Sequence, residues 1–330
     1  MKTLVTTIPF GEKDRKPLDI LENAGAEILI NPLGRKLTED DLSELIPGID
    51  ILIAGTEPVT ERVLDRATEL RLIARVGIGL DSVDLLAARS RGIAVSYTPD
   101  APSPAVGELT IGLMIDLLRS THISNLRIHN GVWYRYFGHR LAEVTIGVIG
   151  LGRIGRRVIK HLAGFDCRRI LVNDSNPDVP TPGHPTCDVE RVEKAQIFRE
   201  ADIISVHIPL SLATRDLITR RELDEMKPGT LLVNTSRGGI INERDLYHAL
   251  ESNRIAGAAI DVFEREPYSG PLKDLDNCLL TAHMGSMSVD CRTQMELEAC
   301  EEAARFMTYQ PLQSAVPEEE FENRRLGAKL

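Results

Sequence analysis

The sequence predicts an α/β protein of two domains, each built around a parallel β-sheet. Three observations lead to this prediction. The chain has 330 residues, enough for two domains that each bury a core. Its first hundred residues alternate short apolar runs with helical stretches, and a second series of such units surrounds a glycine-rich turn near the middle of the chain. A proline-rich segment and a long apolar helix separate the two series.

The first series predicts a small domain with a parallel sheet covered by helices. Its expected strands are short and apolar, and its helical patterns lie between them: strands at 4–8, 27–30, 51–54, 72–76 and 94–96, with helices such as 18–24 and 82–91. We expect residues 1–98 to form a flavodoxin-like α/β domain. Residues 289–309 are again helical and are expected to return to it, so that 289–330 completes the domain. The charged end, 317–330, is expected to fray.

The second series, residues 99–288, is expected to form a domain inserted into the first. It opens with the proline-rich crossing 99–104 and an apolar helix at 105–120. The remaining elements share the same βα pattern: strands at 144–149, 168–174, 203–207, 231–235, 257–261 and 278–281, with a helix at 153–163.

The glycine-rich turn carries the most specific signal in this domain. Gly150-x-Gly152-x-x-Gly155 follows a strand directly and opens a helix, the context in which this motif binds a dinucleotide pyrophosphate. Asp174 ends the next strand, where a ribose hydroxyl needs an acceptor. The sequence therefore predicts a Rossmann-type dinucleotide-binding domain. Asp174 favours NAD over NADP, because a carboxylate there repels a 2′-phosphate.

Composition narrows the function classes. A net charge of −10 argues against a nucleic-acid binder that works by neutralising phosphates. The five cysteines are scattered without a CxxC pair, which predicts neither a disulfide framework nor a metal site and favours a reducing, cytoplasmic location. The N-terminal apolar run is too short for a signal peptide, and no segment has the length of a membrane span, so no membrane partner is expected.

An aromatic cluster spans residues 133–137, where four of five positions are Trp, Tyr or Phe. Such clusters mark contact surfaces when they are exposed. We expect a homodimer formed through Trp133–Phe137; the alternative is that the rings cover the interdomain helix.

Three residues at the ends of expected strands fit one reaction: Arg237, Glu266 and His283. A guanidinium offers a planar fork to a carboxylate and can polarise a carbonyl. An imidazole can deliver a proton to a carbonyl oxygen as a hydride arrives, and a carboxylate on its other nitrogen fixes the tautomer. Singly, each residue could instead be an ordinary surface or loop residue.

Together these residues resemble the D-isomer-specific 2-hydroxyacid dehydrogenases, nearest the 3-phosphoglycerate dehydrogenase branch. The resemblance runs from about residue 70 to 285 through ordered motifs: 75–84, 106–108, 131–133, 150–155, 201–210, 214–218, 234–242 and 261–267. It implies an NAD-dependent oxidoreductase acting on a small anionic 2-hydroxy or 2-oxo acid. Arg237, Glu266 and His283 would then be the catalytic residues.

The resemblance also implies the binding residues. The substrate contacts would be Arg75, Val76, Gly77, Ile78 and Arg237, with Arg135 and Arg140 as further candidate anion contacts. The cofactor contacts would be Gly150, Gly152, Arg153, Ile154, Gly155, Asp174, His207, Pro209, Thr214, Thr235, Asp261 and Gly285.

The chain departs from the family pattern at Pro102, Ala105 and Met284. The resemblance therefore does not determine which substrate this chain uses. We expect 3-phosphoglycerate, glycerate with hydroxypyruvate or glyoxylate, or a phosphonate-like analogue. Two alternatives stay open at this point. One is a phosphite-type oxidising dehydrogenase. The other is an NAD(H)-sensing scaffold like the corepressors that share this fold.

Overall fold

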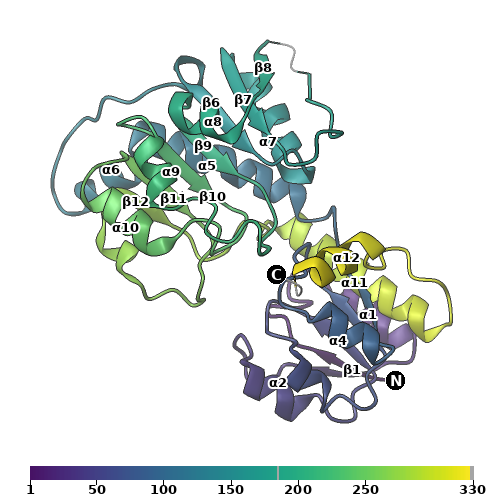
Figure 1. Cartoon of the computed structure of the whole chain (residues 1–330). Coiled ribbons are helices and arrows are strands. Elements are labelled where there is room, and N and C mark those ends of the chain that lie inside the picture. The colour runs from purple at the N-terminus through teal and green to yellow at the C-terminus, as the bar shows by residue number, and fades with distance from the viewer. Residues whose placement is uncertain (184–185, 328–330) are drawn as a thin grey trace. The chain divides into compact units, whose positions relative to one another are not determined.

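The computed structural model describes residues 1–183 and 186–327, which divide into two compact units (Figure 1). Unit 1 consists of Met1–Pro102 together with Met287–Leu330, and unit 2 consists of Ser103–Ser286. Each unit holds one parallel sheet, so the predicted α/β class is confirmed.

Unit 1 is built on a five-stranded sheet in the order β2-β1-β3-β4-β5, in which every neighbouring pair is parallel. This is the strand order of flavodoxin-like folds. Its elements in chain order are β1 (Lys2–Val5), α1 (Lys16–Asn23), β2 (Glu27–Ile30), α2 (Glu39–Leu45), β3 (Ile51–Ala54), α3 (Glu61–Leu64), β4 (Leu72–Arg75), α4 (Leu85–Ser90), β5 (Ala94–Ser96), α11 (Val289–Met307) and α12 (Glu318–Gly327).

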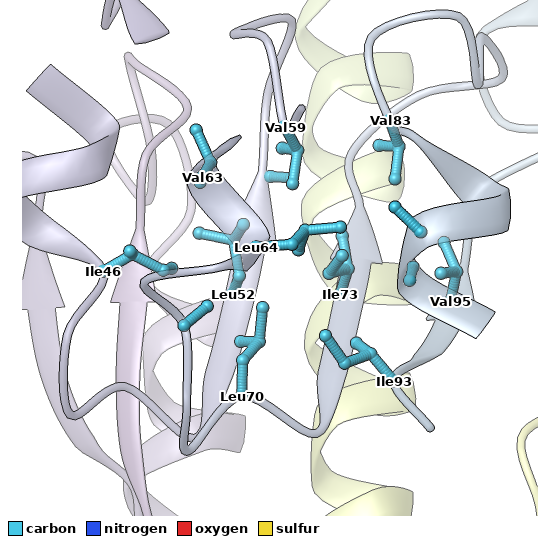
Figure 2. Packing of buried hydrophobic residues seen from close by; sticks show 14 of the residues in the cluster. Ile46, Leu52, Val59, Val63, Leu64, Leu70, Ile73, Val83, Ile93 and Val95 are labelled. Atoms are coloured by element: carbon cyan, nitrogen blue, oxygen red, sulfur yellow. The ribbon is translucent and has the colours of Figure 1, made fainter. Parts of the chain in front are cut away.

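Alternate strand residues of unit 1 enter two cores, one on each face of the sheet. Leu52 and Ile73 pack with the helix side chains around Ile46 and Leu64, as Figure 2 shows. The neighbouring residues Ile51, Ile53, Leu72 and Ala74 face the opposite core, which α1 and α11 complete. Each large side chain buried in this way contributes about 1.5–3 kcal/mol relative to an exposed one.

Unit 2 is built on a seven-stranded parallel sheet in the order β12-β11-β10-β9-β6-β7-β8. The order reverses at β6, beside β9, which is where ligands bind in such sheets. Its elements are α5 (Ser103–Arg119), α6 (Thr121–His129), η1 (Leu141–Glu143), β6 (Thr145–Ile149), α7 (Arg153–Leu162), η2 (Ala163–Phe165), β7 (Arg169–Asn173), β8 (Asp188–Arg191), α8 (Lys194–Glu200), β9 (Ile203–Val206), α9 (Arg220–Glu225), β10 (Leu231–Asn234), α10 (Glu243–Glu251), β11 (Gly257–Ile260), η3 (Pro271–Asp274) and β12 (Cys278–Leu280).

The expectation that residues 317–330 fray is wrong for the part that the structure describes. Residues 318–327 form α12, which packs against α4. Phe321 is buried in the unit 1 core, and the Arg89 guanidinium lies 3.4 Å from its ring centroid while it pairs with Glu318. The buried Phe321 ring anchors this helix to the unit 1 core. The charged composition of the segment gives no indication of this contact. Residues 328–330 lie outside the described residues.

The described helices and the cysteines can be compared with what composition predicts. None of the helices in residues 1–183 and 186–327 combines the length and the apolarity that a membrane crossing needs. All five cysteines are free thiols, and burial raises the pKa of Cys167 to about 11.

Candidate active site

The glycine-rich turn leaves β6 at the point where the strand order reverses. Gly150 has φ +100°, and a Cβ there would overlap the carbonyl of His207. A Cβ on Gly155 would overlap the Gly150 carbonyl oxygen, so this glycine lets α7 pack onto the strand. At Gly152, by contrast, a Cβ would meet nothing within 4 Å. The fold itself leaves this position open, which fits the close approach of a pyrophosphate to the backbone.

Asp174 follows β7 and faces the same turn. Its Oδ2 accepts the backbone N–H of Leu151 at 2.7 Å, and its Oδ1 accepts the N–H of Asn176 at 2.9 Å. The carboxylate is therefore fixed beside the glycine turn and keeps lone pairs that ribose hydroxyls can use. These residues fit an adenine dinucleotide. Arg153 and Ile154, which open α7 next to Gly152, lie in the first turn of that helix.

The next strands supply the remaining predicted cofactor positions. His207 is buried after β9, where its Nε2 lies 2.7 Å from Ser205 Oγ and burial lowers the pKa of the imidazole to about 3. The hydroxyl of Thr214 donates to the Pro209 carbonyl at 2.6 Å and thereby shapes the loop that follows. Thr235 is buried after β10, and its hydroxyl oxygen lies 2.9 Å from the hydroxyl oxygen of Thr110.

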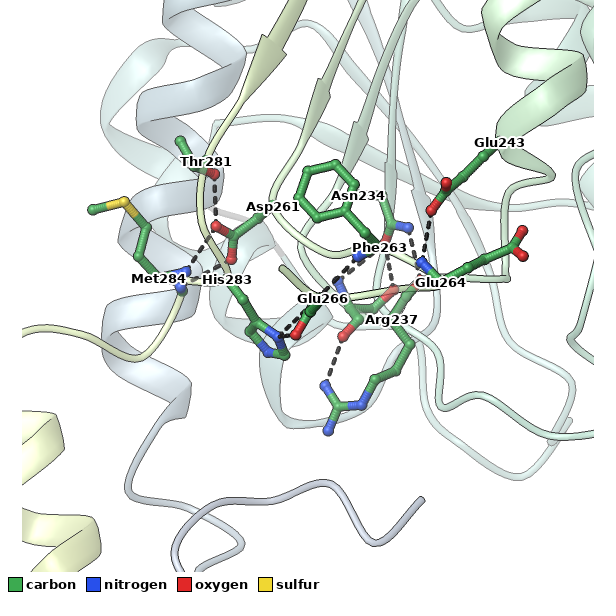
Figure 3. Close-up of polar contacts among 12 residues, drawn as sticks. Asn234, Arg237, Glu243, Asp261, Phe263, Glu264, Glu266, Thr281, His283 and Met284 are labelled. Atoms are coloured by element: carbon green, nitrogen blue, oxygen red, sulfur yellow. Dashed lines mark hydrogen bonds and ion pairs between the residues drawn. The ribbon is translucent and has the colours of Figure 1, made fainter. Parts of the chain in front are cut away.

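Arg237 sits on a turn that the Asn234 side chain organises (Figure 3). The Asn234 amide donates to the Arg237 carbonyl at 2.9 Å, while its Oδ1 accepts the Ser236 N–H at 3.0 Å. Gly238 packs so closely on the next loop that a Cβ would overlap the Phe263 carbonyl. The loops that carry Arg237 and Glu266 are therefore held against each other.

Glu266 and His283 contact each other in the loops that follow β11 and β12. Nδ1 of His283 lies 2.9 Å from both carboxylate oxygens of Glu266. Glu266 Oε1 also accepts the Phe263 N–H at 3.3 Å. Figure 3 shows the His283 ring and the Arg237 side chain extending from neighbouring loops toward the same side. The structure thus pairs two of the predicted catalytic residues, Glu266 and His283, and places the third, Arg237, on a loop that packs against the one carrying Glu266.

Asp261 and Gly285 meet in the turn that carries His283. The Asp261 carboxylate is fully buried and accepts the N–H groups of Met284 at 2.8 Å and Gly285 at 2.9 Å. The Thr281 hydroxyl donates to the same carboxylate at 2.6 Å. His283 itself has φ +50°, a left-handed conformation that a non-glycine residue adopts only when its surroundings fix it.

Some residues that shape this site were not among the sequence predictions. Asn234 belongs to a motif of the resemblance, yet its structural task is visible only in the folded turn. Glu243, at the start of α10, accepts the Glu264 N–H at 2.6 Å, and burial raises the pKa of its carboxyl group. No local sequence signal distinguishes Glu243 from a solvated helix residue.

Four of the predicted substrate contacts lie in unit 1, where Arg75 ends β4 and Val76, Gly77 and Ile78 form the turn that follows. Arg75 and Val76 are buried, and the Arg75 guanidinium donates to the Val76 carbonyl. Gly77 has φ +136° and donates its N–H to the Thr98 hydroxyl at 2.8 Å, with Ile78 following it. Of the other candidate anion contacts, Arg135 and Arg140 are exposed in unit 2.

Comparison with known proteins decides the family. The profile described as "D-isomer specific 2-hydroxyacid dehydrogenase, NAD binding domain" matches residues 111–285. The chain belongs to this family. It is an oxidoreductase that acts on CH–OH groups with NAD(P), a 2-hydroxyacid dehydrogenase, and it carries an NAD-binding domain.

The relatives of this dehydrogenase carry the names of several activities, among them hydroxypyruvate reductase, D-3-phosphoglycerate dehydrogenase and glyoxylate reductase. A hydroxypyruvate reductase of Thermotoga maritima is 34% identical over 295 residues, which cover 86% of this chain and 94% of that protein. A D-3-phosphoglycerate dehydrogenase of Methanocaldococcus jannaschii is 37% identical over 88% of this chain, but the match spans only 55% of that longer protein. Among solved structures, the TT0316 protein of Thermus thermophilus superposes with a TM-score of 0.86 at 31% identity, covering 96% of this chain and 100% of that one.

Proposed function

We propose that this dehydrogenase interconverts a small D-2-hydroxy acid and its 2-oxo acid, with Arg237, Glu266 and His283 as the catalytic residues. The observation that carries the proposal is the Glu266–His283 pair, in which Nδ1 of the imidazole lies 2.9 Å from both carboxylate oxygens. This contact fixes the ring orientation and leaves Nε2 as the atom that exchanges a proton with substrate.

The chemistry follows from these side chains. When bound, the nicotinamide cofactor supplies a hydride to C2 of the substrate or accepts one from it. In the reductive direction, Nε2 of His283 donates its proton to the carbonyl oxygen, and the Glu266 carboxylate balances the charge of the imidazolium before transfer. The Arg237 guanidinium holds the substrate carboxylate and polarises the carbonyl. In the oxidative direction, Nε2 takes the hydroxyl proton as the hydride leaves.

The substrate class is narrower than the family as a whole. We propose 3-phosphoglycerate, glycerate with hydroxypyruvate or glyoxylate, or a phosphonate-like analogue. The names of the relatives support two of these choices. The turn from Arg75 to Ile78 would contact the substrate carboxylate, with the Arg75 side chain beside it, while the N–H groups of Val76 and Gly77 donate to the Ala54 carbonyl and the Thr98 hydroxyl. Residues 1–98 with 289–330 would then be the substrate-binding domain, and 99–288 the inserted NAD-binding domain.

We further propose that NAD is preferred over NADP. The Asp174 carboxylate, held by Leu151 and Asn176, supports this preference because it accepts ribose hydroxyls and repels a 2′-phosphate. The remaining predicted cofactor contacts would line the same carboxyl edge of the unit 2 sheet.

A homodimer through the segment around residues 133–137 completes the proposal. Trp133 is 82% exposed and Phe137 fully exposed, and three apolar residues nearby add to this surface: Leu126, Ile128 and Val132. An apolar surface of this kind is typical of a subunit interface. The scattered cysteines of the sequence support a cytoplasmic location.

The first experiment measures NADH consumption against 3-phosphohydroxypyruvate, hydroxypyruvate, glyoxylate, pyruvate and phosphonopyruvate. His283→Ala should lower turnover by about 10²–10⁴-fold and leave NADH affinity nearly unchanged. His248→Ala is the matched control, because His248 also pairs with a glutamate in unit 2 (3.6 Å from Glu251) but on an exposed face. Glu266→Gln should also lower turnover, whereas Glu264→Gln, on an exposed neighbour, should not.

Two results would contradict the proposal. If His283→Ala keeps wild-type turnover, His283 is not the proton donor. If NADH binds but no 2-oxo acid is reduced, the substrate lies outside the proposed class, and parallel assays of phosphite oxidation and of protein-partner binding then test the two alternatives.

A further inference from the structure

The loop after β7, residues 174–180, has no helix or strand of its own and yet carries the residue that faces the ribose position. Its fold depends on hydrogen bonds from outside the loop. The Asp174 carboxylate ties its start to the glycine turn through the Leu151 N–H at 2.7 Å. The rest of the loop is held by two arginines from neighbouring elements, Arg191 and Arg156.

Arg191, the last residue of β8, donates to four carbonyl groups of this loop. Its Nη2 reaches the Asn176 carbonyl at 2.7 Å and the Asp174 carbonyl at 3.0 Å. Its Nη1 reaches the Val179 carbonyl at 2.5 Å and the Pro177 carbonyl at 3.4 Å. One planar guanidinium therefore organises the loop from the adjacent strand, since β8 pairs with β7 in register (Figure 1).

Arg156 closes the far end of the same loop. Its Nη2 donates to the Pro180 carbonyl at 3.0 Å, and its Nε donates to the Leu151 carbonyl at 2.8 Å. Leu151 thus contacts Asp174 through its N–H and Arg156 through its C=O. The glycine turn and the loop are joined at both ends.

This network of hydrogen bonds contains two arginines and one carboxylate, that of Asp174. Within residues 1–183 and 186–327, Arg156 and Arg191 bond to neutral carbonyls and form no ion pair with a carboxylate. Asp174 is the carboxylate that accepts a backbone N–H of the glycine turn, that of Leu151. Discrimination against a 2′-phosphate therefore depends on where the loop holds this one side chain.

We propose that Arg191 is a positioning residue for cofactor selectivity. It acts through Asp174, by holding the loop so that the carboxylate meets the ribose and excludes a 2′-phosphate. This inference rests on the proposed role of Asp174 in preferring NAD. It does not rest on the catalytic roles of Arg237, Glu266 and His283.

The test uses Arg191→Lys in the full chain, because lysine keeps the charge but cannot span four carbonyls. Dissociation constants for NADH and for NADPH are measured by calorimetry without substrate. We expect the NADH constant to rise about tenfold and the NADPH constant to change less than about threefold, so that selectivity falls. Arg156→Lys, which leaves Arg191 intact, should lower selectivity in the same direction.

A double-mutant cycle distinguishes an effect of Arg191 on the position of the Asp174 carboxylate from a general destabilisation of the loop. In an Asp174→Ala background, Arg191→Lys should leave the ratio of the two constants unchanged, because the carboxylate that it positions is gone. Arg169→Met is the control, since Arg169 begins β7 at the opposite end of the strand and pairs with Glu190 (2.7 Å) and Glu200 (2.6 Å). It should lower stability without changing selectivity.

Each other result overturns the inference. An unchanged ratio in Arg191→Lys, or equal weakening of both cofactors, means that Arg191 does not set selectivity. If Arg191→Lys lowers the selectivity to the same extent in the Asp174→Ala background, Arg191 does not act through the Asp174 carboxylate. If Asp174→Ala itself leaves the ratio unchanged, the proposed role of Asp174 is wrong and the inference about Arg191 falls with it.

Discussion

The backbone carbonyl of Asp261 accepts the N–H of His283 at 2.8 Å, while the Asp261 carboxylate binds the two N–H groups that follow it in the chain. The same aspartate thus contacts the His283 turn from both its main chain and its side chain. These contacts hold His283 at φ +50° and so fix the direction from which its ring meets Glu266. Asp261 therefore has a structural task in the site that is independent of any contact with the nicotinamide.

Replacing Asp261 by asparagine should impair catalysis more than cofactor binding. The substitution puts an NH₂ group where an oxygen now accepts a buried N–H, which costs about 1–3 kcal/mol of stability. We expect kcat to fall about 10–100-fold through misplacement of the imidazole, with the KM for NADH changed less. Thr281→Val removes only the hydroxyl donor, so both the loss of stability and the fall in kcat should be smaller than for Asp261→Asn. A wild-type kcat for Asp261→Asn would show that this contact does not position His283.

The glycines of the cofactor turn should separate binding from stability. Gly152→Ala should unfold like the wild type, because its Cβ enters open space, yet NADH should bind about tenfold or more weakly. Gly155→Ala should lower the free energy of unfolding by about 1–3 kcal/mol, because its Cβ overlaps Gly150. Thermal unfolding and NADH titration of both variants check this. Unchanged NADH affinity in Gly152→Ala would place the pyrophosphate elsewhere.

Burial of His207 should make the stability depend on pH. Its pKa is lowered to about 3 in the folded chain, against an ordinary value of about 6.5. The unfolded chain therefore takes up a proton below pH 6.5 that the folded chain does not. This contribution to stability is complete above that pH and is lost progressively as the pH falls toward 3, with a slope of at most about 1.4 kcal/mol per pH unit.

Urea unfolding at about pH 7.5, 6 and 5 measures this slope. His207→Gln should flatten it, whereas His248→Gln, at an exposed histidine, should not. Equal slopes in the wild type and His207→Gln would show that another group takes up the proton.

The exposed aromatic segment should control the oligomeric state. Light scattering during gel filtration should give a dimer for the wild type at micromolar concentration. A Trp133→Glu and Phe137→Glu double variant should give a monomer, because two charges in an apolar interface cost several kcal/mol. Tyr309→Glu is the control, since Tyr309 is equally exposed but lies in unit 1. A monomeric wild type would contradict the interface.

Most of the unit 2 sheet could be predicted from local pattern. The strands β6, β7, β9, β10, β11 and β12 are short, mainly apolar runs, as is typical of buried parallel strands. β8 escaped prediction because its residues, Asp188 to Arg191, are mostly charged and lie at the sheet edge. The short helices α2, α3 and α8 to α10 were also not predicted, since each has only four to nine residues and little periodicity to read.

Local sequence patterns are enough to predict the parallel α/β architecture, the glycine turn and the residue types proposed for catalysis. These depend on neighbours within a few positions, so short patterns of glycines, apolar residues and strand-end polar residues are enough to reveal them. The groups that hold those residues in place become visible only in the folded chain. Asp261 meets Gly285 because β11 lies beside β12, and Arg191 reaches Asn176 because β8 lies beside β7. Hydrogen bonds of this kind require atoms within about 3 Å. That proximity comes from strand order and not from any spacing along the chain.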